Sequence, residues 1–177
     1  HDRVADRRRV LRPERGGDEV GRVGDLQYRD VVRRVKTKVQ EINGNNIAFS
    51  PSGDSLALST TAWLQQLHVI DLATGRATLL ADSSAGQIRW GADGWLYYPT
   101  RPRGIRRVRV ADGEREIVVP NDPEGRWATL SPVPLSNGRA LLYTRVPRLP
   151  WNPAQAEIVA VDLRTGRSHV LTRGIDA

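Results

Sequence analysis

Arginine and tryptophan are the side chains of this sequence that are best suited to binding chemistry. All but two of the 27 basic residues are arginine, the exceptions being Lys36 and Lys38. The guanidinium group is a planar fork that can hydrogen-bond both oxygens of a carboxylate, and the indole ring supplies apolar contact area. Six of these residues fall in the longer segments between apolar runs: Trp63, Arg101, Arg103, Arg126, Arg148 and Trp151. We expect them to bind a protein or peptide ligand, with an acidic ligand favoured.

Two alternatives to this binding hypothesis stay open. The indoles of Trp63 and Trp151 can pack on their own sheets while the arginines are merely solvated. The arginines are also spread along the whole chain, a distribution that a general bias in arginine usage would produce.

Motifs for catalysis or metal binding are absent from the sequence. It has no glycine-rich nucleotide loop followed by a strand lysine, no His-Arg-Asp or Asp-Phe-Gly kinase segment, and no G-x-S-x-G hydrolase elbow. It also lacks cysteine and the H-E-x-x-H, EF-hand and Walker patterns. Of its three histidines, His68 and His169 fall on expected strands, and His1 would need a second histidine to chelate copper. The sequence predicts no catalytic residue, no metal site and no cofactor, and it leaves open whether a longer parent protein is an enzyme.

Glycine turns recur along the chain in two series. The first series has spacings of 41 and 44 residues and comprises Ser52-Gly53, Asp93-Gly94 and Asn137-Gly138. The second comprises Thr74-Gly75, Asp112-Gly113 and Thr165-Gly166. Each turn separates two short runs that alternate in polarity and are rich in Val, Ile, Leu, Tyr and Thr, which is typical of β-hairpins. Four strands in each repeat of about 40 residues predict the blade of a β-propeller.

These patterns predict an all-β chain with three four-stranded antiparallel blades, a partial propeller that follows an N-terminal basic arm. The blades should span about residues 46–81, 87–119 and 127–172, within a region of 43–177. A sandwich of two packed sheets is the competing architecture, because the same short strands would fit it. Closed propellers have about four to eight blades. We therefore expect either further blades outside this sequence or a homodimer that completes the ring.

Residues 1–42 lie outside the repeat. They contain 12 basic and 8 acidic residues, and up to Gly24 their composition is typical of a poorly ordered arm. Apolar residues then recur at spacings of three and four in 26–42, which favours a short helix, with a strand that completes a blade as the alternative. Acidic residues interrupt the basic groups and no nucleic-acid-binding motif is present, so nucleic acid is not the expected partner. No signal peptide and no membrane segment is visible.

The expected topology places the long connections at one end of the blades. In a four-stranded antiparallel blade, the first and third turns lie at one end, while the second turn and the link to the next blade lie at the other. The first and third turns are all tight here. The other end therefore receives the longer segments, which carry the six candidate binding residues: 61–65, 82–86, 100–104, 120–126 and 146–155.

Two segments of the first repeat carry a family resemblance: IAFSPSGDSLALSTT and LHVIDLATGRATLLAD. They resemble the TolB-like (WD40-like) β-propeller repeat. The later repeats, which include QIRWGADGWLYYPT and AEIVAVDLRTGRSHVLTRG, more closely resemble the C-terminal propeller of bacterial serine/threonine protein kinases. The chain departs from the repeat consensus at Ser52, where aspartate is usual, and at Gly91-Ala92, where Ser-Pro is usual.

The resemblance implies a role as well as a fold. It implies a non-catalytic binding or scaffold module, which would be a sensor or protein-interaction part of a larger bacterial protein such as a receptor-type kinase. It also implies an extracytoplasmic or periplasmic location. Two alternatives stay open because a fold transfers between proteins better than a function does. They are the substrate-gating propeller of a prolyl-oligopeptidase-type peptidase and a Tol-Pal-type periplasmic interaction protein.

Overall fold

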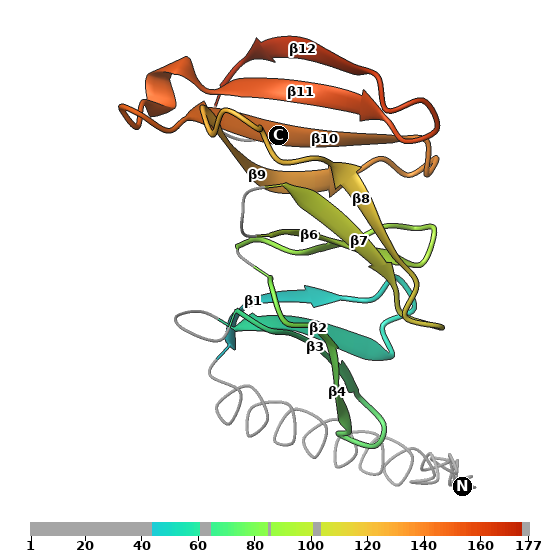
Figure 1. Cartoon of the computed structure of the whole chain (residues 1–177). Helices are drawn as coiled ribbons and strands as arrows, with labels where there is room; N and C mark the ends of the chain where they lie inside the picture. The colour runs from blue at the N-terminus through green and yellow to red at the C-terminus, as the bar shows by residue number, and fades with distance from the viewer. Residues whose placement is uncertain (1–43, 61–64, 85, 101–103, 175–177) are drawn as a thin grey trace, which may run out of the picture.

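The structure is a computed structural model that describes residues 44–60, 65–84, 86–100 and 104–174. In these residues the chain forms twelve strands, arranged in three four-stranded antiparallel sheets (Figure 1). Within each sheet the strands pair in the order of the sequence, so each sheet is a simple meander. We call the sheets blades 1, 2 and 3.

The strand bounds define the three blades. Blade 1 consists of β1 (Gly44–Phe49), β2 (Ser55–Thr60), β3 (Leu67–Asp71) and β4 (Ala77–Ala81). Blade 2 consists of β5 (Arg89–Trp90), β6 (Trp95–Pro99), β7 (Ile105–Arg109) and β8 (Arg115–Val119). Blade 3 consists of β9 (Trp127–Pro134), β10 (Ala140–Pro147), β11 (Glu157–Asp162) and β12 (Ser168–Arg173). A short 3-10 helix, η1 (Pro153–Gln155), lies between β10 and β11.

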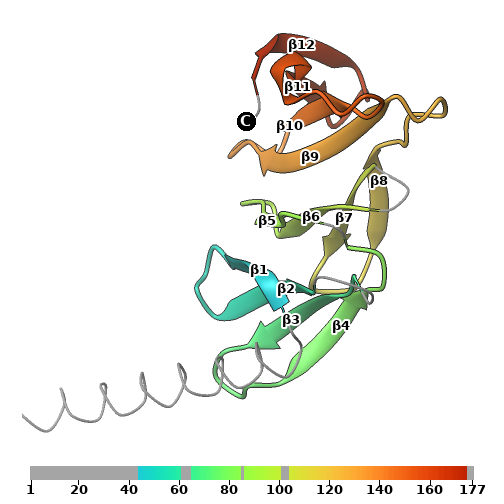
Figure 2. The ribbon, with the colours of Figure 1, turned by 90° about the vertical axis from the view of Figure 1, so that its left-hand side faces the viewer.

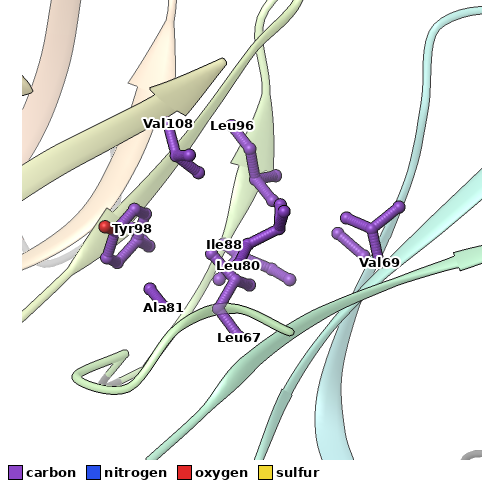
Figure 3. Close-up of a cluster of buried hydrophobic side chains, with 9 residues drawn as sticks. Leu67, Val69, Leu80, Ala81, Ile88, Leu96, Tyr98 and Val108 are labelled. Carbon is purple, nitrogen blue, oxygen red and sulfur yellow. The ribbon is translucent and has the colours of Figure 1, made fainter. Parts of the chain in front are cut away.

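Two apolar layers join the blades face to face, and Figure 2 shows the three sheets following one another. Alternate residues of a strand point to opposite faces, so β6 contributes to both layers. Leu96 and Tyr98 pack with blade 1 in the cluster of Figure 3, whereas Trp95 and Tyr97 pack with blade 3. All five residues of β6 are buried, so this strand is covered on both faces. Burial of apolar surface contributes about 25 cal/mol of stabilisation for each Å² removed from water.

The tight turns explain why the segment IDLATGR of blade 1 recurs as VDLRTGR in blade 3. In blade 1, Asp71 Oδ1 accepts hydrogen bonds from the backbone N and the Oγ1 of Thr74, at 2.6 and 2.7 Å. In blade 3, Asp162 Oδ1 accepts the same pair from Thr165, at 2.7 and 2.9 Å. The glycine that follows has a positive φ, for example +71° at Gly75, which residues with a Cβ rarely adopt.

The architecture predicted from the sequence is confirmed. The chain is an all-β partial β-propeller with three four-stranded antiparallel blades, and the sandwich is wrong because no strand crosses from one sheet to another in the described residues. The first strand of blade 2 is short, since β5 covers only Arg89–Trp90. The arm of residues 1–42 and the helix expected at 26–42 lie outside the described residues. Within the part of the chain that the structure describes, no helix has the length and apolar character needed to cross a membrane.

Candidate binding site at the long-connection end of blade 3

The structure brings three of the six predicted binding residues together. Arg126 precedes β9, and Arg148 and Trp151 follow β10. The backbone N of Arg148 donates to the carbonyl of Arg126 at 2.8 Å, and Arg148 also forms an antiparallel bridge with Trp151. Trp63, Arg101 and Arg103 lie outside the described residues, so their expected participation stays a prediction.

The turn after β10 presents apolar side chains to solvent. Leu149 is 88% exposed and Trp151 is 52% exposed. The turn is closed by a hydrogen bond from Asn152 N to Pro147 O (3.3 Å), and Asn152 Oδ1 then caps η1 by accepting Ala154 N (3.1 Å). The indole of Trp151 is therefore held at the surface and is only half covered by its own blade.

The two arginines of this end differ in their partners. Arg126 Nε lies 3.0 Å from Glu124 Oε2 and 3.8 Å from Asp122 Oδ2. Arg148 Nη1 donates only a long bond of 3.4 Å to Gly125 O, and among the described residues no carboxylate pairs with it. Of these two guanidinium groups, that of Arg148 is therefore the more available to an acidic ligand.

Asp122 is committed to the link between blades 2 and 3. Its Oδ2 accepts backbone N–H groups from Arg126 (2.7 Å) and Trp127 (3.0 Å), and its Oδ1 accepts Glu124 N (3.2 Å). Desolvation acts to raise the pKa of Asp122, but these backbone donors outweigh it and hold the pKa below its ordinary value. This carboxylate therefore orients the segment that carries Arg126.

A cavity of about 330 Å³ opens between blades 2 and 3 beside this link. We call it the interblade cavity. Its walls come from β8, the link and the facing side of blade 3, and its polar lining residues are Asn121, Asp122, Arg126, Thr129, Tyr143, Arg145 and Ser168. Its volume lies at the lower end of the range of ligand sites.

Arg145 lies over the Trp127 ring at one wall of the interblade cavity, with its guanidinium carbon 4.5 Å from the ring centroid. Its Nε donates to Glu157 Oε2 at 2.7 Å, and its Nη2 lies 2.6 Å from the same oxygen. The wall therefore offers a fixed cation that is stacked on an aromatic face.

Thr129, Trp127 and Arg145 were not among the residues predicted from the sequence. They lie on strands, where a polar residue at an alternating position is usually a solvated one. One signal could have found Arg145: it follows Leu141 and Tyr143 at steps of two, so a period of two places it on the same face as these buried residues. Among the described residues, no group of three or more His, Asp and Glu side chains has the arrangement of a metal site.

Comparison with known proteins supports the fold. No protein-family model matches the chain, and no curated protein matches it in sequence. Among solved structures, TolB from Acinetobacter baumannii is 17% identical with a TM-score of 0.59, over 75% of this chain and 33% of that one. A putative TolB from Agrobacterium tumefaciens is also 17% identical, with a TM-score of 0.60, over 70% of this chain and 47% of that one. An oligogalacturonate lyase from Vibrio parahaemolyticus is 16% identical with a TM-score of 0.61, over 76% of this chain and 41% of that one.

These likenesses establish a fold and no more, because all three identities are low. The match spans between a third and a half of each solved chain. None of these three structures is a kinase propeller, so the finer resemblance expected from the sequence receives no support from them. The structural neighbours of this chain are TolB-like β-propellers, and its three blades match part of such a propeller.

Proposed function

We propose that this chain is a non-catalytic binding module that docks an acidic segment of a partner protein at the long-connection end of blade 3. The docking surface consists of Arg126, Arg148, Leu149 and Trp151. The observation that carries the proposal is the exposed apolar pair of Leu149 and Trp151 beside Arg148, whose guanidinium has no carboxylate partner in the described residues.

Each component of the docking surface supplies a different contribution. The indole and the leucine side chain offer apolar area that is removed from water on binding. The Arg148 guanidinium offers a paired contact to a carboxylate. Tryptophan and arginine are also the residues most often found at the energetic centres of protein interfaces.

The larger setting of the module rests on resemblance. A sensor or interaction part of a larger bacterial protein, located outside the cytoplasm, is what the repeat resemblance implies. The peptidase alternative is favoured by a specific likeness, since a prolyl endopeptidase matches 75% of this chain with a TM-score of 0.53 over 23% of its own length. Reading the coding sequence on both sides of this chain separates the two settings.

Fluorescence anisotropy with a labelled peptide of alternating glutamate and leucine tests the docking proposal. The full chain should bind this peptide and bind its glutamine counterpart at least about tenfold more weakly, because the charge-assisted hydrogen bonds are lost. Arg148→Ala and Trp151→Ala should each weaken binding about tenfold or more. Arg164→Ala is the matched control, since this exposed arginine of blade 3 lies in the tight turn between β11 and β12. Equal losses for Arg148→Ala and Arg164→Ala would show non-specific attraction and refute the proposal.

A further inference from the structure

The interblade cavity contains a polar group that the protein itself does not satisfy. Thr129 is only 8% exposed, and its Oγ1 is the single buried side-chain oxygen or nitrogen without a hydrogen-bond partner among the described residues. Register pairs Thr129 with Arg145 on the adjacent strand, so both side chains face the cavity. A buried hydroxyl without a partner is costly in a folded protein, and such groups are often explained by a function.

Arg145 is the second group with unused capacity. Its Nε and Nη2 share one oxygen of Glu157, and no described residue pairs with its Nη1. Stacking on Trp127 fixes the plane of the guanidinium. The free edge is therefore held in place before any ligand arrives, which lowers the entropy lost on binding.

The lining of the cavity carries two cations and one carboxylate. Arg126 and Arg145 are the cationic lining residues, and Asp122 is the only acidic lining residue in the described part of the chain. Outside the lining, Glu124 pairs with Arg126 and Glu157 pairs with Arg145. The Asp122 oxygens are already occupied by three backbone N–H groups. What remains on the wall is a set of donors: guanidinium N–H groups and the hydroxyls of Thr129 and Ser168.

The remaining walls select among anions. Val118, Val161 and the Trp127 ring are apolar lining residues. A short aliphatic stem that ends in a carboxylate satisfies both kinds of wall, because its methylene groups meet the valines while its oxygens meet the donors. A glutamate side chain has this chemistry.

Arg126 connects the interblade cavity with the docking surface, because it belongs to both. We propose that the interblade cavity is the specificity pocket of the module and binds the carboxylate of one acidic side chain from the docked segment, with Thr129 and Arg145 as donors. This inference rests on the proposed function and adds to it the residue type that the segment must carry.

The test uses a substitution that changes chemistry without changing shape. Thr129→Val removes the hydroxyl and keeps the branched side chain that suits a strand. In the full chain, this variant should bind the glutamate-leucine peptide about tenfold more weakly, since a hydrogen bond to a charged group is lost. The glutamine peptide should lose much less. Thr78→Val, at an exposed position of β4 in blade 1, is the matched control and should leave the affinity unchanged.

A small probe isolates the interblade cavity from the docking surface. N-acetylglutamate amide should shift the indole N–H signal of Trp127 in an NMR titration of the full chain, whereas N-acetylglutamine amide should not. Ser168→Phe, which adds bulk at the cavity wall, should abolish that shift and provides a second route if Thr129→Val does not fold.

The outcomes separate this inference from the proposed function. Loss of peptide binding in Arg148→Ala with full binding in Thr129→Val overturns the pocket and retains the docking surface. An unshifted Trp127 signal at millimolar N-acetylglutamate amide also overturns the pocket. No binding of the peptide by the unchanged protein overturns both. A loss in Thr129→Val together with a shifted Trp127 signal supports the pocket.

Discussion

A cluster of one arginine, one tryptophan and one glutamate lies at each end of the interface between blades 2 and 3, but the two clusters have different surroundings. Beside the tight turns, Arg107 lies 4.3 Å from the Trp95 ring centroid and its Nη2 lies 2.6 Å from Glu116 Oε2. Beside the long connections, Arg145 lies 4.5 Å from the Trp127 ring centroid, with Nη2 at 2.6 Å from Glu157. Each set spans three neighbouring strands of one blade.

The difference lies in what surrounds each guanidinium. Arg107 Nη1 also donates to Tyr97 Oη at 3.1 Å, and Tyr97 Oη in turn donates to Asp93 Oδ2 at 2.9 Å. Burial raises the pKa of Tyr97 to about 12, so this hydroxyl stays protonated and keeps donating at neutral pH. Among the described residues, no such chain of hydrogen bonds reaches Arg145, which faces the interblade cavity instead. Each of the three nitrogens of Arg107 therefore has a partner within the protein, whereas Nη1 of Arg145 has none among the described residues.

The largest expected effect is on stability and concerns the Arg107 cluster. Arg107→Ala should lower the free energy of unfolding by about 3 kcal/mol, because it removes a largely buried guanidinium together with its ion pair to Glu116, its cation–π contact and its hydrogen bond to Tyr97. Arg145→Ala should cost about 1 kcal/mol, since the Arg145 side chain is more exposed than that of Arg107 (30% against 15%) and fewer groups depend on it. Urea denaturation followed by tryptophan fluorescence measures both. Equal losses would show that the two ends do not differ in this way.

A smaller effect on stability, of opposite sign, is expected at the interblade cavity. Thr129→Val should raise the free energy of unfolding by about 1 kcal/mol in the absence of ligand, because a buried hydroxyl without a partner is replaced by an apolar group of the same shape. Thermal unfolding monitored by circular dichroism provides the measurement. A destabilised variant would mean that the hydroxyl has a partner in the protein, and the contrast between the two ends would then fail.

The sequence allowed the strands and the tight turns to be predicted because local rules determine them. The alternation of apolar and polar residues defines the runs, and Asp71 and Asp162 cap turns that the following glycines close. The long-connection end could be predicted as well, since topology alone separates it from the tight turns.

The interblade cavity could not be predicted in this way, because it depends on how two blades meet. A bulge at Ser131, which has a φ of +48°, reverses the alternation of β9. As a result, Thr129 faces blade 2 with Arg145 while Val133 pairs with Leu142 on the opposite face. A serine in the left-handed region within a strand has no clear sequence signature.

The smallest expected effect concerns acid and the turns that form the tight end. Hydrogen bonds from Thr74 lower the pKa of Asp71, and those from Thr165 lower the pKa of Asp162, below the ordinary value of 3.8. A lowered pKa in the folded state adds stability above the unfolded pKa, and this stability is lost as the pH falls through the folded pKa. The urea midpoint should therefore drop as the pH falls from about 5 to about 2, and the double variant Asp71→Asn, Asp162→Asn should drop less. An equal drop of the urea midpoint in the double variant and the unchanged protein would show that these two carboxylates do not contribute to the acid sensitivity.

The central claim is that the docking surface and the interblade cavity bind the peptide, whereas the cluster of Arg107, Trp95 and Glu116 does not. A titration of the isotope-labelled full chain with the glutamate-leucine peptide, followed by the indole N–H signals of the tryptophans, tests this claim directly. Trp151 belongs to the docking surface and Trp127 to the interblade cavity. The other two described tryptophans serve as references, because Trp95 stacks with Arg107 and Trp90 donates to the carbonyl of Ala48 between blades 1 and 2. We predict that the signals of Trp151 and Trp127 shift with one saturable affinity while those of Trp95 and Trp90 stay in place. Shifts at Trp95 with unchanged signals at Trp127 and Trp151 would contradict the account.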